Sequence, residues 1–596
     1  MFHFLRWLTA LCVCVFMFAA GDAFAQQPGA GPFGRGAGQP PFPGGGRGGR
    51  LGMPPRDNAE PQTGTGRIAG RVVSAETGTP VRRAQVSLNA REARVNRNVA
   101  TDNEGRFEFA GLPAGRYRLN VNKAGYVPLE YGQARPFESG KPLDLADSGV
   151  LDKIDFSLPR GSVITGRIID EYGDPITDVQ VQALRYQFVN GERQLVNAGR
   201  AARTDDLGQY RIFGLMPGDY VVHATLRDGP QRAREQSTGH VGYPGTYYPG
   251  VAEVGQAQPV TVTLAQELSG IAFSLVPARF ARVSGTVVAS DGRPLDGAML
   301  LLRPRMGGGG PLMNLLGGAG RSQTDSNGSF RMMSVPPGDY ILEVQQRPNR
   351  QQNVQQALTQ LEFASVPVNV AGDIDNFMVV TTAGTSMSGR VVYEGAQNPP
   401  RAGMQVMAVG GDGTPSLRGI AGRALGVGRV SGDNTFQLQG LYGPQMIRVQ
   451  GVPAGWALKS ITVNGLDVTD TPFDFKSAGT ITGAIVTLTN RLSEITGQVR
   501  DARGQPMADY VLVVFPDDPK LWAAPSRHVQ STRPNQNGTF SVKGLPAGRY
   551  LAAAIPSLEN GLQNDPTVLA GLRGIAEPFA IGDGEAVNLN LTMRSP

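Results

Sequence analysis

The chain has 596 residues, a length that suggests several domains rather than one. Its 80 glycines and 44 prolines, with only 7% aromatic residues, favour many short strands joined by tight turns over long helices. The net charge of +6 is small for this length, so the composition gives little support for a polyanionic partner such as a nucleic acid. Both cysteines, Cys12 and Cys14, lie in the apolar N-terminal segment, which excludes disulfides and cysteine chemistry from the rest of the chain.

The first 25 residues have the features of a secretory signal peptide. Arg6 supplies a positive charge, residues 8–20 form an apolar run that is short for a membrane span, and Ala23 and Ala25 stand where a signal peptidase reads small residues. Cleavage before Gln26 is therefore predicted in preference to a membrane anchor. We expect an exported protein that is periplasmic, on the outer surface or secreted.

Residues 26–65 form a low-complexity linker rich in glycine, proline and arginine. This segment lacks the apolar residues that a core requires, so the sequence predicts a flexible, disordered tether. Its Arg-Gly pairs resemble RNA-binding segments, but in an exported protein a spacer is the favoured interpretation.

From residue 66 the sequence repeats at intervals near 100 residues. Each repeat opens with a strand that ends in Gly-x-Val or a close variant, and four repeats continue with a Gly-x-Pro turn such as Gly173-Asp174-Pro175. The fourth repeat is degenerate and replaces this turn with residues 397–400. The glycines of the opening strands are Gly70, Gly166, Gly285, Gly389 and Gly497.

The middle of each repeat contains two further turn motifs. An Asp-x-x-Gly turn, as in Asp102 to Gly105, caps its own backbone with the aspartate and uses glycine for the positive φ. A Pro-x-Gly or Pro-Gly corner follows and leads into a tyrosine such as Tyr117. Apolar residues alternate on both sides of these turns, which indicates strands with one buried face.

About seven short strands per repeat predict an all-β chain: a tandem array of about five antiparallel β-sandwich modules after the signal peptide and linker. The predicted modules are residues 66–160, 161–280, 281–384, 385–491 and 492–596.

The combination of Gly-Arg-Val, Gly-x-Pro, Thr-Asp-x-x-Gly-x-Phe and Leu-Pro-x-Gly-x-Tyr resembles the carboxypeptidase regulatory-like family. Members are prealbumin-like sandwiches, related in shape to collagen-adhesin B-type and starch-binding-like modules. The resemblance is strong in repeats one, two, three and five and weak in repeat four. The regulatory domain accompanies a peptidase but does not hydrolyse peptides itself, so the resemblance implies a module without catalytic activity.

The residues of this chain also argue against an enzyme. The histidines after the signal peptide are His223, His240 and His528, and none of them stands in a zinc-peptidase motif. Neither a Gly-x-Ser-x-Gly elbow nor a phosphate-binding Gly-x-x-x-x-Gly-Lys loop occurs. The adjacent acids Asp205 and Asp206 would face opposite sides of a strand, so joint acid–base work by this pair is disfavoured. We expect no catalytic residue and no cofactor.

Related adhesin modules form Lys–Asn crosslinks, and the Asp-x-x-Gly turns are similar to parts of calcium loops. No lysine lies between Lys153 and Lys459, which excludes such a crosslink from the second and third modules. One or two acids per turn suffice for a hairpin and seldom for an ion, so plain turns are favoured and no metal site is expected. Calcium binding by some module stays open.

Five aromatic residues are candidates for ligand binding by stacking on sugars or on partner proteins. They are Tyr243, Tyr247, Tyr248, Trp456 and Trp522. Packing at module junctions is the favoured alternative for each ring.

Two functions follow from these observations. The first is an envelope or cell-surface scaffold, adhesion or interaction array without catalysis, and the alternative is polysaccharide binding through exposed loop aromatics. The expected partners are envelope proteins or surface glycans, with no nucleic acid and no integral membrane segment after signal cleavage.

Overall fold

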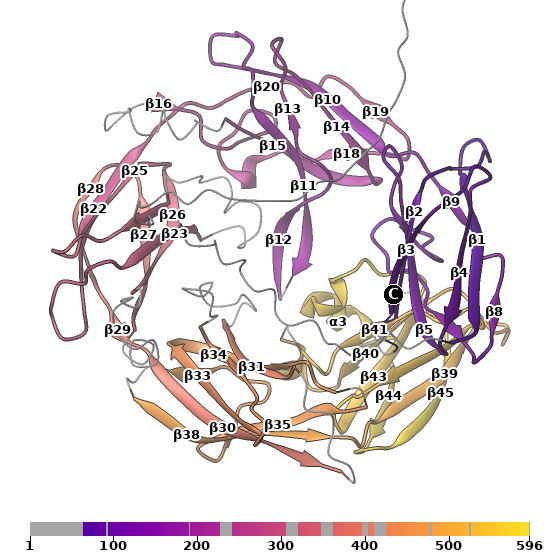
Figure 1. The fold of residues 1–596 in the computed structure, drawn as a ribbon. Helices are drawn as coiled ribbons and strands as arrows, with labels where there is room; N and C mark the ends of the chain where they lie inside the picture. Colours follow the sequence, from indigo (N-terminus) through magenta and orange to yellow (C-terminus); the bar gives the residue numbers. More distant parts are fainter. Residues whose placement is uncertain are drawn as a thin grey trace, which may run out of the picture. The chain divides into compact units, whose positions relative to one another are not determined.

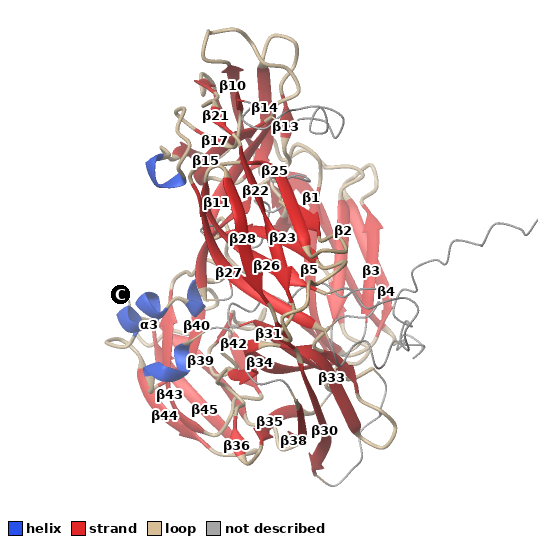
Figure 2. Ribbon diagram, turned by 90° about the vertical axis from the view of Figure 1, so that its left-hand side faces the viewer, coloured by secondary structure: helices blue, strands red, loops and turns tan. Residues whose placement is uncertain are grey.

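The computed structural model describes residues 64–594, except 91–92, 94, 190, 227–240, 306–319, 347–360, 396–402, 411–424, 454, 476–478 and 524–525. The described residues are almost entirely strands and turns (Figures 1 and 2), which confirms the predicted all-β class. The predicted signal peptide and all but the last two residues of the predicted linker lie outside them. None of the helices in the described part is long and apolar enough to cross a membrane.

Five pairs of sheets follow one another along the chain, each pair enclosing a hydrophobic core. We number these β-sandwiches 1 to 5 by their strands. In each, the first sheet holds the opening strand of the repeat and the second sheet packs on its apolar face. The predicted domain boundaries stay a prediction.

Sandwich 1 has nine strands, four in its first sheet and five in its second. The first sheet holds β4 (Arg106–Leu112), β1 (Gly66–Ser74), β8 (Val150–Leu151) and β9 (Phe156–Leu158). The second sheet holds β3 (Val95–Ala100), β2 (Gln85–Ala90), β5 (Gly115–Asn122), β6 (Leu129–Glu130) and β7 (Leu143–Leu145).

Sandwich 2 has the same plan with a longer second sheet. Its first sheet holds β14 (Gln209–Leu215), β10 (Ser162–Ile169), β19 (Glu267–Leu268) and β20 (Phe273–Ser274). Its second sheet holds β12 (Glu192–Asn197), β11 (Gln180–Val189), β15 (Gly218–Thr225), β17 (Thr246–Tyr247), β13 (Ala202–Arg203) and β18 (Val260–Val262). A short pair, β16 (Val241–Gly242) with β21 (Ala278–Arg279), and the 3₁₀ helix η1 (Val254–Gln256) complete it.

Sandwich 3 has a three-stranded first sheet and a five-stranded second sheet. The first holds β25 (Ser329–Val335), β22 (Ala281–Val288) and β28 (Ile374–Val380), and the second holds β24 (Arg321–Gln323), β23 (Met299–Pro304), β26 (Gly338–Gln345), β27 (Glu362–Val370) and β29 (Thr382–Ala383).

In sandwich 4, the degenerate repeat, a hairpin extends the first sheet. That sheet holds β33 (Thr435–Leu441), β30 (Thr385–Glu394), β38 (Thr480–Thr489), β35 (Ala457–Val463) and β36 (Leu466–Asp467). The second sheet holds β32 (Val427–Arg429), β31 (Gln405–Gly410), β34 (Gly443–Gln450) and β37 (Phe473–Phe475).

Sandwich 5 carries the described helical turns beyond η1. Its first sheet holds β42 (Thr539–Lys543), β39 (Glu494–Arg500) and β45 (Ala586–Thr592), and its second holds β41 (Gln530–Thr532), β40 (Val511–Pro516), β43 (Gly548–Ile555) and β44 (Glu577–Ile581). The 3₁₀ helices η3 (Pro519–Trp522) and η4 (Leu562–Asn564) and the helix α3 (Pro566–Leu572) complete it, and Leu569 and Leu572 of α3 bury on the side of β40 that faces away from the sandwich core.

The sheets are antiparallel as predicted, except that the opening strand of every sandwich also has a parallel neighbour. The repeat glycine explains how that neighbour comes so close. A Cβ atom on Gly497 would lie 1.8 Å from the carbonyl oxygen of Leu589, and the four equivalent glycines give 1.8–2.2 Å. Any other residue would therefore push the parallel strand away.

The repeat tyrosines close their own corners. Each is buried, and each hydroxyl donates to the carbonyl four residues earlier, which satisfies a polar group that the tight turn leaves unpaired. The pairs are Tyr117 with Pro113 (2.6 Å), Tyr220 with Met216 (2.6 Å), Tyr340 with Pro336 (2.9 Å) and Tyr550 with Pro546 (2.8 Å).

The aspartates of the Asp-x-x-Gly motifs cap their turns as predicted. Asp205 Oδ1 accepts from the backbone N–H groups of Leu207 (3.0 Å) and Gln209 (2.8 Å), and Asp102 and Asp325 do the same in their own turns. Across the described residues, no group of three or more His, Cys, Asp or Glu side chains could hold a metal ion. These hydrogen bonds are the backbone capping that the Asp-x-x-Gly motifs predicted.

Candidate functional site

Two of the five candidate aromatic rings, those of Tyr247 and Trp522, are buried. Trp522 packs edge-on against Phe515 with a centroid distance of 5.7 Å, and its indole N–H donates to the carbonyl of Pro516 at 2.8 Å. Tyr247 lies against the buried ring of His223 at 4.4 Å. Because the indole N–H of Trp522 is hydrogen-bonded inside the protein, burial of the ring stabilises the fold without leaving a polar group unpaired.

The other three candidate rings are half-buried. Tyr248 packs edge-on against Phe273 at 5.9 Å, and Trp456 packs edge-on against Tyr393 at 5.3 Å. The Tyr243 hydroxyl donates to the carboxylate of Glu171. These rings contribute mainly to packing, and the structure does not bring the five candidates together on one surface of a sandwich.

An exposed aromatic residue that the sequence reasoning missed lies at the tip of sandwich 2. Tyr172, in the turn between Asp170 and Gly173, is 84% exposed. Leu207 is 54% exposed in a neighbouring turn. A hydrogen bond from Ile168 N to Gly208 O (2.9 Å) holds this turn beside the end of the strand that leads to Tyr172.

The other repeats show the signal that could have found this tip. In sandwich 2 the residues before the two turn glycines are Tyr172 and Leu207. In the equivalent turns of sandwiches 1, 3 and 5, the residue before the glycine is polar. These polar residues are Thr77, Glu104, Asp291, Asn327, Arg503 and Asn537. An apolar residue that a turn does not require, and that the core does not bury, is available for contact with a ligand or partner.

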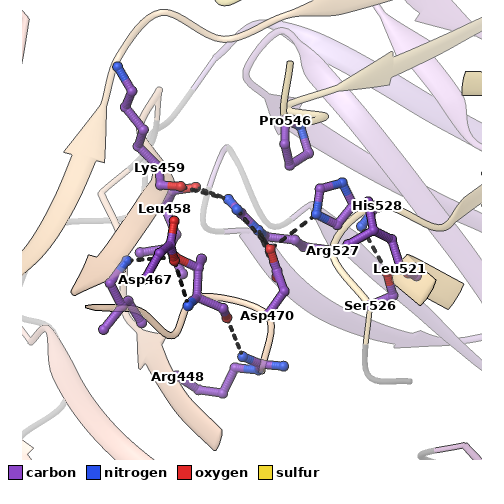
Figure 3. A network of polar contacts seen from close by, with 12 residues as sticks. Arg448, Leu458, Lys459, Asp467, Asp470, Leu521, Ser526, Arg527, His528 and Pro546 are labelled. Carbon is purple, nitrogen blue, oxygen red and sulfur yellow. Dashed lines mark hydrogen bonds and ion pairs between the residues drawn. The ribbon is translucent and has the colours of Figure 1, made fainter. Parts of the chain in front are cut away.

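A half-buried polar network joins sandwich 4 to sandwich 5 (Figure 3). Asp470, at the end of the β35–β36 region, receives three contacts from the Arg527 guanidinium at 2.9, 3.1 and 3.0 Å. The other guanidinium nitrogen of Arg527 donates to the carbonyls of Leu458 (2.8 Å) and Lys459 (3.0 Å). His528 Nε2 lies 3.1 Å from Asp470 Oδ2. One arginine of sandwich 5 therefore holds a carboxylate and two main-chain carbonyls of sandwich 4.

Electrostatics favour the charged form of Asp470. Burial by itself would raise the pKa of this carboxyl, but the hydrogen bonds from His528 and Arg527 outweigh it and hold the pKa at about 2. Asp470 therefore carries its negative charge at neutral pH and attracts the Arg527 guanidinium. The pair is half-buried, so water screens it less than an ion pair on the surface.

The order Asp470, His528, Tyr550 resembles a carboxylate–histidine–hydroxyl triad, but its geometry does not suit catalysis. Tyr550 lies 2.9 Å from His528 Nδ1, and the same hydroxyl donates to the carbonyl of Pro546 at 2.8 Å. The hydroxyl is buried and burial raises the pKa of Tyr550. A nucleophile must lose its proton to the histidine and reach a substrate, and this hydroxyl does neither.

A second junction joins sandwich 1 to sandwich 5 through an almost fully buried arginine. The Arg533 side chain is 2% exposed and contacts Glu138, itself 4% exposed, at 3.3 Å, although 395 residues separate them in sequence. Arg533 also donates to the carboxylate of Asp509 and to the carbonyl of Ser139 (3.1 Å). Lys141 adds an ion pair with Asp509 at 3.2 Å.

At a third junction, the Arg185 side chain of sandwich 2 contacts both sandwich 1 and sandwich 5. Arg185 donates to Glu559 of sandwich 5 at 2.7 Å, and its guanidinium carbon stands 3.3 Å from the centre of the Phe137 ring of sandwich 1. Phe137 also accepts a hydrogen bond from Asn560 N at its carbonyl (2.9 Å). Sandwich 5 is thus in polar contact with sandwiches 1, 2 and 4.

Comparison with solved structures gives neighbours of low similarity. The Bacillus anthracis TIE protein is 12% identical, with 72% of each chain covered and a TM-score of 0.14. The streptococcal ancillary pilin is 13% identical, covering 53% of this chain and 99% of its own, with a TM-score of 0.22. BcpA, the major pilin subunit of Bacillus cereus, is 13% identical with the same coverage and a TM-score of 0.13. Such values establish no common function.

No curated protein matches the chain. Residues 67–146 match the family description "Carboxypeptidase regulatory-like domain". This range runs from β1 to just beyond β7 and so takes in most of sandwich 1. The match over these residues confirms the resemblance to the carboxypeptidase regulatory-like family that the turn and strand motifs predicted.

Proposed function

We propose that the chain is an exported, non-catalytic array of β-sandwiches that serves as a scaffold or adhesion protein of the cell envelope. The repeated sandwiches, the buried triad-like hydroxyl and the predicted signal peptide support this function. The predicted boundaries near residues 160, 280, 384 and 491 divide the array into five modules.

The observation that carries the proposal is the buried Arg533–Glu138 ion pair between the first and last sandwiches. Burying two charges is costly, and the cost is offset only when the partners hold a fixed geometry with further hydrogen bonds. Arg527 and Arg185 form two further contacts between sandwiches, which also fix how neighbouring sandwiches meet. A protein that presents surfaces at fixed spacing benefits from these junctions, whereas a flexible tether does not.

The test is a pull-down with the mature chain from Gln26 onward against solubilised envelope proteins and a panel of insoluble polysaccharides. Retention of a discrete envelope protein, reduced in Arg533→Ala, supports a scaffold with fixed spacing. Turnover of any substrate that depends on a defined residue of the chain would contradict the non-catalytic role.

Polysaccharide binding is the second candidate, and the exposure of Tyr172 favours it. A flat ring displayed on a turn can stack on a sugar face. Retention on one polysaccharide that is lost in Tyr172→Ala supports this function. Arg503→Ala changes the equivalent turn position of sandwich 5 and is the matched control, which should bind as the unmodified chain does. Equal binding by all three chains would contradict a role of Tyr172.

A further inference from the structure

The strand that runs parallel to the opening strand ends the first sheet in most sandwiches. Sandwich 4 differs, because β35 pairs antiparallel with the far side of β38, for example at Ile461 with Val486. In sandwich 3 the sheet order is β25-β22-β28, so the far side of β28 has no ladder partner among the described residues. The chain therefore contains both a covered and an open version of the same edge.

The open edge of β28 differs from the corresponding edges of the other sandwiches. In sandwiches 1 and 2 the equivalent strand is broken into pieces of two or three residues, which give no continuous template. The equivalent β45 of sandwich 5 is seven residues long, but it exposes the polar side chains of Asn588 and Asn590. Among the described strands at these edges, β28 alone combines seven residues with exposed large apolar side chains: Met378 is 67% and Val380 58% exposed.

The backbone of β28 presents its hydrogen-bonding groups to this edge at the same two residues. Thr381 N donates to Val288 O of the neighbouring β22 at 2.9 Å. Because backbone groups alternate sides along a strand, Val379 also faces β22, and Met378 and Val380 direct their N–H and C=O groups to the open edge. Natural proteins block such edges with charge, proline or short strands, and residues 377–380 carry neither charge nor proline.

We propose that the open edge of β28 pairs with β28 of a second copy of this chain, antiparallel about a two-fold axis at Val379. This register places Met378 of each chain opposite Val380 of the other as hydrogen-bonded pairs, which gives four backbone hydrogen bonds and brings four exposed apolar side chains together. The proposed scaffold function does not require this self-association, so either can hold without the other.

Charge is compatible with pairing of two identical strands. The acidic end of β28 holds Asp375, which pairs internally with Arg282 at 2.8 Å. In the proposed register the two Asp375 residues are eight positions apart along the joined strands, about 26 Å at about 3.3 Å per residue. This separation exceeds the Debye length of about 8 Å at physiological salt, so the carboxylates do not repel the pair.

The interface is small, so we expect a reversible dimer that forms at high chain concentration. Sedimentation velocity of the mature chain over a range of concentrations should show a shift from monomer to dimer. Met378→Lys should abolish the dimer because it places two charges in the joined sheet. Asn590→Lys on β45 is the matched control and should leave the dimer unchanged.

A second variant separates loss of pairing from loss of folding. Met378→Pro removes an N–H that faces the open edge and no hydrogen bond to β22, so circular dichroism should stay as in the unmodified chain while the dimer is lost.

A monomer at every concentration would overturn the proposal. A dimer that persists in Met378→Lys would also overturn it, because another surface would then be responsible. Binding of a foreign extended peptide to β28 by a chain that never dimerises would assign the edge to another partner and exclude self-pairing.

Discussion

Acidification is expected to destabilise sandwich 2 through the buried histidine His223. His223 is 1% exposed and lies against the Tyr247 ring, and among the described residues no hydrogen-bond partner meets its Nδ1 atom. Burial lowers the pKa of His223 to about 4, against 6.5 for an unperturbed histidine. The folded sandwich therefore holds the neutral ring, and protonation favours the unfolded state.

The sign and size of the effect follow from proton linkage. Because the folded pKa lies below the unfolded one, the stabilisation is fully present above pH 6.5 and is lost as the pH falls towards 4. The difference between these two values corresponds to about 3 kcal/mol, or roughly a hundredfold change in the opening equilibrium.

Hydrogen exchange measured by mass spectrometry can follow this loss in individual strands, after correction for the intrinsic pH dependence of exchange. Protection of β15 amides should fall roughly a hundredfold between pH 7 and pH 4 in the unmodified chain. In His223→Leu, which cannot titrate, the fall should be largely absent, and β26 of sandwich 3 is the internal control. An equal fall in His223→Leu would refute the reasoning.

Three further changes test the junctions and the repeat glycine. Arg533→Ala removes the guanidinium that contacts the buried Glu138 carboxylate. In urea unfolding, this change should destabilise the contact of sandwiches 1 and 5 by about 3–5 kcal/mol. An unchanged unfolding midpoint would contradict the burial of this ion pair. Gly497→Ala should lower the free energy of unfolding by about 1–3 kcal/mol, because its methyl group would overpack against the parallel strand. Gly571→Ala in α3, where no atom lies within 4 Å of the added Cβ, is the control and should leave stability unchanged or raise it. Equal effects of the two changes would argue against the close strand approach. Asp470→Asn should loosen the contact of sandwiches 4 and 5 at neutral pH. Because burial opposes and the hydrogen bonds favour the charge of Asp470, with a resulting pKa of about 2 against an ordinary 3.8, the unmodified contact should weaken only as the pH falls through this range; insensitivity of the contact to Asp470→Asn would contradict the network.

The local features of this protein could be predicted from its residues. Alternating apolar positions gave the strands, the Asp102 type of turn gave the hairpins, and the glycine of each opening strand marked the repeat. These features depend on neighbours within a few residues, because a turn needs its own capping group and a strand its own period. The family resemblance rested on the same local motifs and holds for residues 67–146.

Only the tertiary structure decided which side chains are displayed and which are buried. Tyr247 and Trp522 were candidates for ligand contact and lie in the interior, while Tyr172 is exposed on a turn. Sequence period cannot separate a ring that packs under a neighbouring segment from one that faces solvent. That choice depends on the segment that folds over it.

The junctions between sandwiches lay equally beyond sequence reasoning. Arg533 and Glu138 are 395 residues apart, and neither stands in a repeat motif that could have marked it. The open edge of β28 is also defined by an absence of pairing that appears only when all strands of the sheet are in place. Turns and strands follow from local chemistry, whereas partners across the chain follow from packing, which brings together residues that no local pattern relates.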